Sequence, residues 1–124
     1  MDRVLCRPLG IPSASLVELA GALHGPASQE LSRVVRQAAH GSVRWIIFDL
    51  RAAGTLDSQA IGALLLACRL CEGRSGRAIL LSPPPAVTLL LEALGIASRF
   101  LVSDDYNGIL QDLSHRSASG EVEW

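Results

Sequence analysis

The stretch TLDSQAIGALLLACRLC, residues 55–71, places an acidic residue and a hydroxyl directly before a long apolar run. The uncharged part, from Ala60 to Cys68, is far shorter than the roughly 20 apolar residues that a membrane-spanning helix needs. The pattern instead predicts the start of a buried helix, with Asp57 as the N-cap and Ser58 as the first helical residue. Two interpretations of Ser58 stay open: a plain part of the helix start, or a phosphorylation site, since a helix N-terminus accommodates a phosphate.

Strands are expected on both sides of this helix, which should end near Gly73. Before it, WIIFDL (45–50) is typical of a central strand that is buried on both faces. After it, RAILLS (77–82) has the same character, and three prolines then break the strand. Hydrophobic periodicity and turn residues predict further strands over 3–8, 14–20 and 98–103, and further helices over 27–39, 86–94 and 106–114.

The predicted order of elements is β-β-α-β-α-β-α-β-α. An antiparallel hairpin comes first, and the alternation after it implies a mostly parallel sheet with right-handed crossovers. The fold class expected is therefore α/β, in a single domain over residues 1–114. The tail, residues 115–124, has no periodicity and is expected to be mobile.

The composition is that of a folded domain without a strong overall charge. Apolar residues make up 49% of the 124 residues, and the formal net charge of −1 argues against a basic surface for nucleic acid. The N-terminus shows no apolar segment of a signal peptide, and three cysteines fit a reducing compartment without disulfides. We therefore expect a cytoplasmic protein.

No catalytic set, cofactor motif or metal-ligand spacing is found in the sequence. Cys68 and Cys71 form a C-x-x-C pair, but they fall late in the predicted helix, whereas reactive thiols of this kind lie at a helix N-terminus. The three histidines, His24, His40 and His115, lack the spacing of zinc ligands. We expect both cysteines to be buried, reduced and metal-free, and the chain not to be an enzyme.

The helix that starts at Ser58 has an unusually apolar outer face. Its side toward the sheet should carry Ile61, Leu64, Leu65, Cys68 and Cys71. The opposite side carries Gln59, Gly62, Ala63, Leu66, Ala67 and Leu70. A merely solvated face would carry charges, so we interpret this side as a partner surface. Burial by another element of the same chain, or contact in a dimer, stays open.

Together these elements resemble the STAS domain of anti-sigma-factor antagonists. The resemblance is carried by WIIFDL, the loop RAAGTLDSQAIG, RAILLS, the segment PPPAVTLLLEALGI and the closing SRFLVSDD, and it covers roughly residues 3–113. In that family a loop ending in Asp-Ser-Ser/Thr-Gly leads into a helix. Here Asp57 and Ser58 match the first two positions, and Gln59 and Ala60 follow them. The resemblance implies a four- or five-stranded sheet with an N-terminal antiparallel strand, packed by about four helices.

The resemblance also implies a function in bacterial transcription regulation. In the family the first serine of this motif, here Ser58, is phosphorylated by an anti-sigma factor that is a serine-protein kinase. The unphosphorylated antagonist binds the anti-sigma factor and frees the sigma factor, and phosphorylation breaks the contact. The alternative is a STAS subunit of a lipid-transport ABC complex, which docks on the transporter ATPase.

The expected partner surface surrounds Ser58. It consists of Leu23, His24, Gly25, Gln59, Gly62, Ala63, Leu66 and Leu70. We expect no cofactor, no binding of nucleic acid and no direct insertion into a membrane, and a homodimer is left open.

Overall fold

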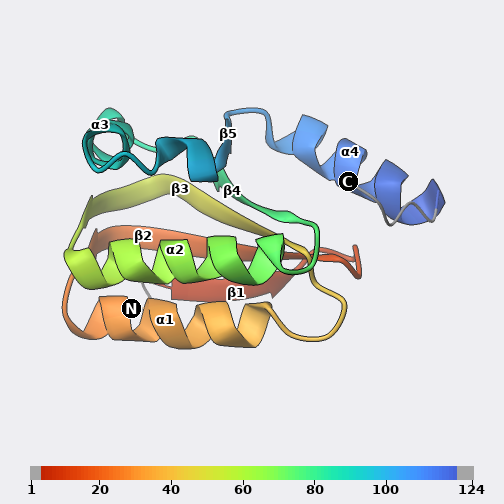
Figure 1. Ribbon diagram of the computed structural model, residues 1–124, viewed down its shortest axis with the longest axis horizontal. Helices are drawn as coiled ribbons and strands as arrows, with labels where there is room; N and C mark the ends of the chain where they lie inside the picture. The colour runs from red at the N-terminus through yellow and green to blue at the C-terminus, as the bar shows by residue number, and fades with distance from the viewer. Residues whose placement is uncertain (1–3, 120–124) are drawn as a thin grey trace.

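A single sheet with strand order β1-β2-β3-β4-β5 organises the part of the chain that the structure, a computed structural model, describes, residues 4–119. β1 is antiparallel to β2, and every later pair of neighbours is parallel. Figure 1 shows this arrangement. The strands are β1 (Val4–Pro8), β2 (Ala14–Leu23), β3 (Trp45–Leu56), β4 (Arg77–Leu81) and β5 (Leu101–Ser103). The predicted α/β fold with an N-terminal antiparallel strand is confirmed.

Helices cover both faces of the sheet. α1 and α2 lie side by side on one face, and α4 packs on the other (Figure 1). The helical elements within residues 4–119 are α1 (Pro26–Ala38), α2 (Ser58–Glu72), α3 (Pro85–Ala93), the short 3-10 helix η1 (Ala97–Arg99) and α4 (Tyr106–Ser119). In this part of the chain, no helix is long and apolar enough to span a bilayer.

β3 explains why the core has two parts. Alternate side chains of a strand point to opposite faces. Ile46 and Phe48 therefore join the cluster under α1 and α2, while Trp45 and Ile47 join the smaller cluster under α4. All four are buried, which confirms the prediction that WIIFDL is a central strand covered on both faces.

β2 and β3 are longer than predicted. β2 continues to Leu23 and β3 to Leu56, and these two residues are partners at the ends of the paired strands. The extra residues include Ala52, Ala53 and Gly54, whose weak apolar pattern gives no strand signal. Over these residues the backbones of β2 and β3 pair with each other, so the strands continue although the pattern of side chains does not predict them. This extension carries the start of α2 to one end of the molecule.

Two other boundaries also differ from the prediction. The expected strand over 98–103 starts with η1, since Phe100 N donates to Ala97 O, and only Leu101–Ser103 pair with β4. α4 continues to Ser119, so the boundary expected at 114 falls inside a helix. An ion pair between Asp112 and Arg116, one turn apart, supports this continuation. Residues 120–124 of the predicted tail lie outside the described residues.

Candidate functional site

Asp57 is the N-cap of α2, the position that the sequence predicts for it. Its backbone is extended, with φ −86° and ψ 177°, and Oδ1 accepts a hydrogen bond from Ala60 N at 2.9 Å. Ile61 N donates to the Asp57 carbonyl oxygen at 3.1 Å and starts the helical ladder. Asp57 therefore satisfies one of the N–H groups that a helix start leaves without a partner.

The same carboxylate joins α2 to the beginning of α1. Gly25 N donates to Asp57 Oδ2 at 3.0 Å, and Ser28 Oγ lies 2.6 Å from Asp57 Oδ1. The Ser28 hydroxyl also lies 2.9 Å from the Leu23 carbonyl oxygen. These donors lower the pKa of Asp57 to about 2, with the Ser28 hydroxyl as the largest cause and the Ala60 and Gly25 N–H groups after it.

Ser28 is the functional residue that sequence reasoning missed. It is fully buried, although a serine in the first turn of a helix commonly faces solvent or caps its own helix. Its partner, Asp57, is distant in the sequence and is brought near by the parallel pairing of β2 with β3. No signal local to α1 indicates that contact.

The turn before α1 has a conformation suited to glycine. Gly25 has φ +56°, in the left-handed region, and precedes Pro26 at the start of α1. Beside it, His24 Nε2 lies 2.9 Å from Thr55 Oγ1, a second hydrogen bond between this turn and the end of β3. The loops at the starts of α1 and α2 therefore form one connected surface.

Ser58 lies exposed on this connected surface, as the first residue of α2. The neighbouring Asp57 carboxylate already accepts three hydrogen bonds and stays ionised well below neutral pH. A general base that activates a serine nucleophile needs a pKa near neutral pH. Asp57 does not meet this requirement.

Two residues of the predicted partner surface are buried in the core. Leu23 is 0% exposed and Ala63 is 2% exposed, so the prediction that their side chains contact a partner is wrong. Leu23 lies at the end of β2 with its side chain in the core under α1 and α2. Ala63 belongs to a side of α2 made of small residues, with Ala60 and Ala67, that are all buried.

The orientation of α2 explains that burial. Glu72 pairs with Arg99 of η1, which fixes the side of α2 that faces β4 and η1. Ala63 and Ala67 lie on the other side, where α1 packs alongside α2 (Figure 1). The apolar character of this side therefore comes from packing within the chain, the alternative that the sequence left open.

The remaining predicted residues stay accessible. His24, Gly25, Gln59 and Gly62 are exposed, and Leu66 and Leu70 are half-buried against the core. Gln59, Gly62 and Leu66 follow one another at helical spacing, so they form a single stripe on the outer face of α2. This stripe begins beside Ser58.

The C-x-x-C pair faces the core. Cys68 is 0% and Cys71 1% exposed, and burial raises the pKa of Cys68 to about 11 and that of Cys71 to about 12. Both thiols are free, and among the described residues no three potential metal ligands lie together. The predicted burial of both cysteines is confirmed.

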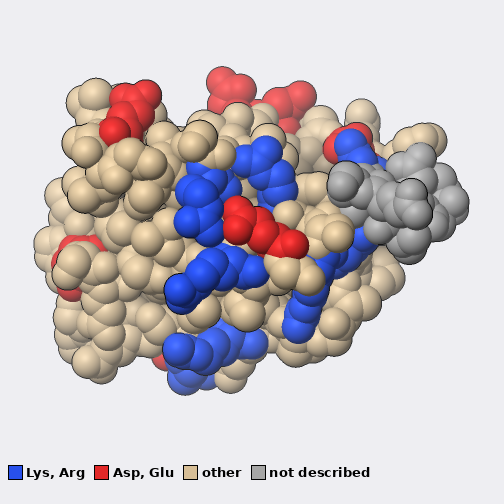
Figure 2. Space-filling model, viewed as in Figure 1, with Lys and Arg blue, Asp and Glu red and all other residues tan. Residues whose placement is uncertain are grey.

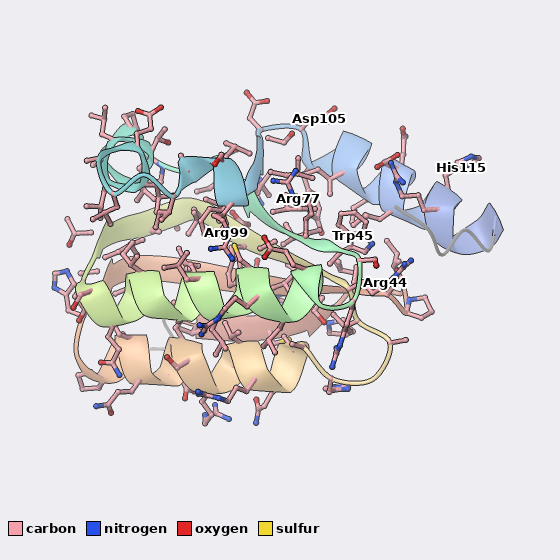
Figure 3. The ribbon with its side chains drawn as sticks, in the orientation of Figure 1. Arg44, Trp45, Arg77, Arg99, Asp105 and His115 are labelled. Carbon is pink, nitrogen blue, oxygen red and sulfur yellow. The ribbon has the colours of Figure 1, made fainter. Side chains whose placement is uncertain are left out.

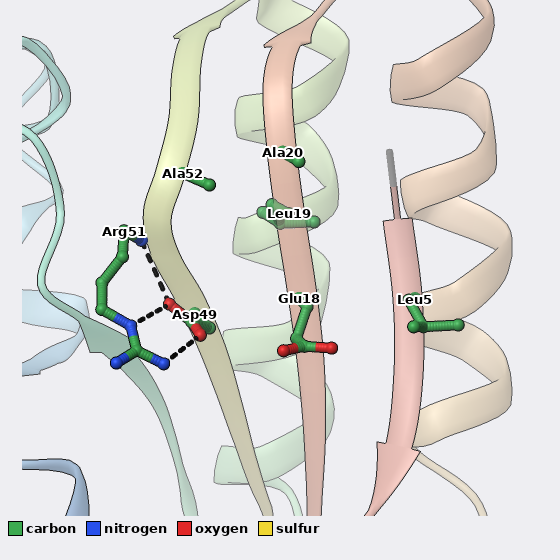
Figure 4. A pocket seen from close by; sticks show the side chains of 7 residues that line it. All are labelled: Leu5, Glu18, Leu19, Ala20, Asp49, Arg51 and Ala52. Carbon is green, nitrogen blue, oxygen red and sulfur yellow. Dashed lines mark hydrogen bonds and ion pairs between the residues drawn. The ribbon is translucent and has the colours of Figure 1, made fainter. Parts of the chain in front are cut away.

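A separate shallow pocket lies on the sheet face opposite α1 and α2. It has a volume of about 390 Å³, and Figure 4 shows its lining residues, with the Asp49 carboxylate held by Arg51. Arg51 makes two side-chain hydrogen bonds to Asp49, at 2.7 and 2.9 Å, and the Arg51 N–H adds a third at 3.1 Å. The Arg51 side chain is the main cause that lowers the pKa of Asp49. The pairing of β2 with β3 shifts register here, and Asp49 satisfies a backbone N–H at the irregularity.

Comparisons with known proteins agree with the architecture. The family model described as STAS domain matches residues 9–108. The solved structure of the anti-sigma factor antagonist SpoIIAA in its unphosphorylated form is 23% identical, with a TM-score of 0.71 over 88% of this chain and 94% of that one. SpoIIAA of Bacillus in the phosphorylated form is 22% identical, with a TM-score of 0.71 over 88% and 98%.

A third similar structure comes from Thermotoga maritima. It is a putative anti-sigma factor antagonist, 13% identical, with a TM-score of 0.76 over 89% of this chain and 93% of that one. At these identities the likeness to solved structures concerns the fold. Among curated proteins, none matches this chain by sequence.

Proposed function

This chain belongs to the STAS domain family, and on that premise we propose that it is an anti-sigma-factor antagonist controlled by phosphorylation of Ser58. Its partner is an anti-sigma factor that is also a serine-protein kinase. The unphosphorylated protein binds this partner through the surface around the start of α2. Transfer of a phosphoryl group to the Ser58 hydroxyl weakens the contact.

The observation that carries the proposal is the exposure of Ser58 directly after an N-cap that is already satisfied. Asp57 holds α1 and α2 together through Ser28, Gly25 and Ala60. A phosphate on Ser58 is therefore not needed for capping, and its attachment breaks none of these hydrogen bonds. The fold is expected to persist while the surface charge changes.

The charges near Ser58 make that change large. A phosphoserine carries about 1.5 to 2 negative charges near neutral pH. The sequence has no lysine or arginine between Arg7 and Arg33, nor between Arg51 and Arg69, so neither loop at this surface supplies a lysine or arginine that could pair with the phosphate. The phosphate adds to the charge of Asp57 and faces the partner without a lysine or arginine of these loops as its counter-ion.

The test uses Ser58→Ala as bait in the native cell. This variant cannot accept the phosphoryl group and should hold the partner constitutively. We expect recovery of a protein with kinase activity toward wild-type chain, with Ser58 as the phosphorylated residue in mass spectrometry. The purified partner should then bind Ser58→Asp about five- to 150-fold more weakly than wild type, which corresponds to about 1–3 kcal/mol.

Ser114→Asp is the matched control, since it places the same charge on an exposed serine of α4. It should bind as wild type does. The proposal fails if the bait recovers a transporter ATPase, if phosphate maps to another residue, or if Ser58→Asp and Ser114→Asp bind equally well.

A further inference from the structure

Arginines gather on one face of the molecule although the chain has almost no net charge. Figure 2 shows blue side chains over the middle of this face, around one acidic residue, with the other acidic residues visible there nearer its margins. Arginines occur in the last turns of α1 and α2, in the turn after α2, at the start of β4 and in η1. We call Arg36, Arg69, Arg74, Arg77 and Arg99 the basic patch. Its acidic member is Glu72, which pairs with Arg99 at 3.0 Å.

Three of these arginines have structural partners. Arg74 Nη1 donates to the Val43 carbonyl oxygen at 2.9 Å, and Arg77 Nη2 donates to the Ser98 carbonyl oxygen at 3.1 Å. Arg99 makes two hydrogen bonds to Glu72. Figure 3 shows Arg77 and Arg99 close to η1 and above α2. These bonds explain part of the patch by local packing.

Arg36 and Arg69 are different. Both are exposed, and neither side chain has a hydrogen bond or ion pair with the residues that the structure describes. Each lies in the last turn of its helix, where the helix dipole favours a cation. That effect is small at an exposed site, and like charges close together repel. Local stability therefore gives little reason to keep both beside three other arginines.

The basic patch is continuous with the surface around Ser58. Gln59, Gly62 and Leu66 form the exposed stripe of α2, and Arg69 is the next residue along the same stripe. From Gln59 to Arg69 the helix rises about 15 Å, at 1.5 Å per residue. A partner that lies along α2 would therefore contact Ser58 at one end and the basic patch at the other.

We propose that the basic patch docks an acidic surface of the partner protein, which lies along α2 from Ser58 to its C-terminal end. The inference rests on the proposed function for the identity of the partner, but the acidic character of the docked surface follows from the charges of this chain. Opposite charges at the edge of an interface mainly raise the association rate. The patch thus guides the partner onto the surface around Ser58.

A protein fits the surface along α2, from Ser58 to the basic patch, better than a nucleic acid or a membrane does. This surface has half-buried leucines, Leu66 and Leu70, with arginines at its border, the arrangement of an apolar interface centre and a charged rim. No aromatic residue occurs in α1, α2 or η1, so these elements offer no platform for stacking bases. The carboxylate of Glu72, in the middle of the patch, would repel a continuous layer of phosphates.

Site-specific photo-crosslinking in the native cell tests the proposal. The photoreactive residue p-benzoylphenylalanine replaces Gly73, which is exposed as the C-cap of α2 and has an ordinary φ of −64°. A Cβ at this position would make ordinary van der Waals contacts with the carbonyl oxygens of Arg69 and Leu70, at 3.4 and 3.7 Å. The background is Ser58→Ala, so phosphorylation cannot release the partner. The same residue in place of Ser114 on α4 is the positional control.

We expect the probe at position 73 to attach to an acidic segment of a protein, as identified by peptide mass spectrometry, and the probe at position 114 not to do so. Adding Arg36→Gln and Arg69→Gln should lower the yield several-fold. With the captured protein purified, this double variant should slow association on the order of tenfold at low ionic strength and much less at high ionic strength. The control pair Arg7→Gln and Arg116→Gln removes the same charge on β1 and α4, outside the patch, and should change association little.

The outcomes separate the two proposals. An acidic segment from a protein that is not a kinase supports the docking site and contradicts the proposed function. A kinase that cross-links through a segment without acidic residues contradicts the docking site alone. Cross-links to nucleic acid or lipid, no cross-link above the level of position 114, or equal effects of the two arginine pairs would each overturn the docking proposal.

Discussion

At the scale of single residues, the Asp57 carboxylate connects three segments that are separate in the sequence. It accepts hydrogen bonds from the turn at Gly25, from Ser28 in α1 and from Ala60 in α2. All three donors favour the ionised carboxylate, so its charge is stabilised by folding. Asp57 thereby fixes the position of Ser58 while Ser58 itself makes no contribution to the cap.

Folding stability should depend on pH through Asp57. Its pKa is about 2 in the folded protein and 3.8 without the fold, so the folded state favours the ionised form. The resulting stabilisation is complete above about pH 4 and is lost as the pH falls toward about 2. Asp57→Asn keeps an oxygen that can cap α2 but has no charge to titrate. Its melting temperature should therefore fall less steeply over this range than that of wild type.

Thermal denaturation followed by circular dichroism, at several pH values, measures this difference. Asp112→Asn is a suitable control, because Asp112 pairs with Arg116 at an exposed position remote from the site. Parallel curves for wild type and Asp57→Asn below about pH 4 would show that Asp57 has an ordinary pKa and that the hydrogen bonds do not act as described.

Ser28→Ala should destabilise the protein by about 1–3 kcal/mol, because it removes a buried hydroxyl donor that Asp57 and the Leu23 carbonyl share. Ser32→Ala, on the same helix and half-buried, should cost much less. Urea denaturation gives both values. In addition, Ser28→Ala should lose most of its effect in an Asp57→Ala background, since the two residues form one network. Additive effects would contradict that network.

At the scale of elements, α2 has three sides with different roles. One side, with Ile61, Leu64 and Cys68, faces the sheet, and the side with Ala63 and Ala67 faces α1. The third side is exposed and carries the stripe from Gln59 to Arg69. Small residues toward α1 permit close packing of the two helices, while glycine at position 62 leaves the exposed side flat.

Substitutions at two adjacent positions should distinguish these sides. Ala63→Leu adds bulk to a packed contact and should destabilise the fold by about 1–3 kcal/mol. Gly62→Ala adds a methyl group with no atom within 4 Å and should stabilise α2 by about 0.5–1 kcal/mol. Chemical denaturation of both variants tests the assignment. A neutral Ala63→Leu would mean that α1 does not cover this side.

The comparison of α2 with β3 shows how far the sequence could predict the elements. The start of α2 was predictable because a capping residue and an apolar period are local signals. The end of β3 was not, because Arg51–Leu56 have little apolar pattern and are held by pairing with β2. The same limit affects the site: Ser58 and Asp57 are found locally, whereas Ser28 becomes relevant only when β2 and β3 are paired.

The face of α2 toward α1 illustrates a second limit. The sequence identifies Ala63 and Ala67 as apolar and outside the stripe that faces the sheet, but it does not say which element covers them. Small apolar residues on a helix face are expected both where another helix of the chain packs and where a partner protein binds. Only the position of α1 beside α2 decides between them.

At the scale of the whole molecule, the sheet separates two clusters of different size. The larger lies under α1 and α2 and includes both Cys68 and Cys71, and the smaller lies under α4. Charge is divided as well, because arginines gather at one end of α1 and α2 while the Ser58 surface at the other end has none in its loops. Net charge alone conceals this division.

The three cysteines report on the integrity of the whole core. Cys6 is exposed on the edge strand β1, whereas Cys68 and Cys71 are buried and their pKa values are raised by burial. The thiolate is the reactive form, so a thiol reagent near neutral pH should modify Cys6 first. The other two should react only when the helix layer separates from the sheet, because both sulfurs lie in the large cluster.

Separation of the helix layer from the sheet should cost a free energy close to that of unfolding, about 5–15 kcal/mol for an ordinary domain. The open state is then rare, so labelling of Cys68 and Cys71 should be at least about 10³-fold slower than that of Cys6. Mass spectrometry during labelling should show one early adduct at Cys6, then Cys68 and Cys71 modified together. Cys6→Ser should abolish the early adduct and leave the slow phase unchanged. Ala63→Leu should accelerate the slow phase by about tenfold for each 1.4 kcal/mol of lost stability, since both cysteines become accessible through the same opening. Early modification of Cys68 or Cys71 in the wild-type protein would contradict the packing of α2 against the sheet.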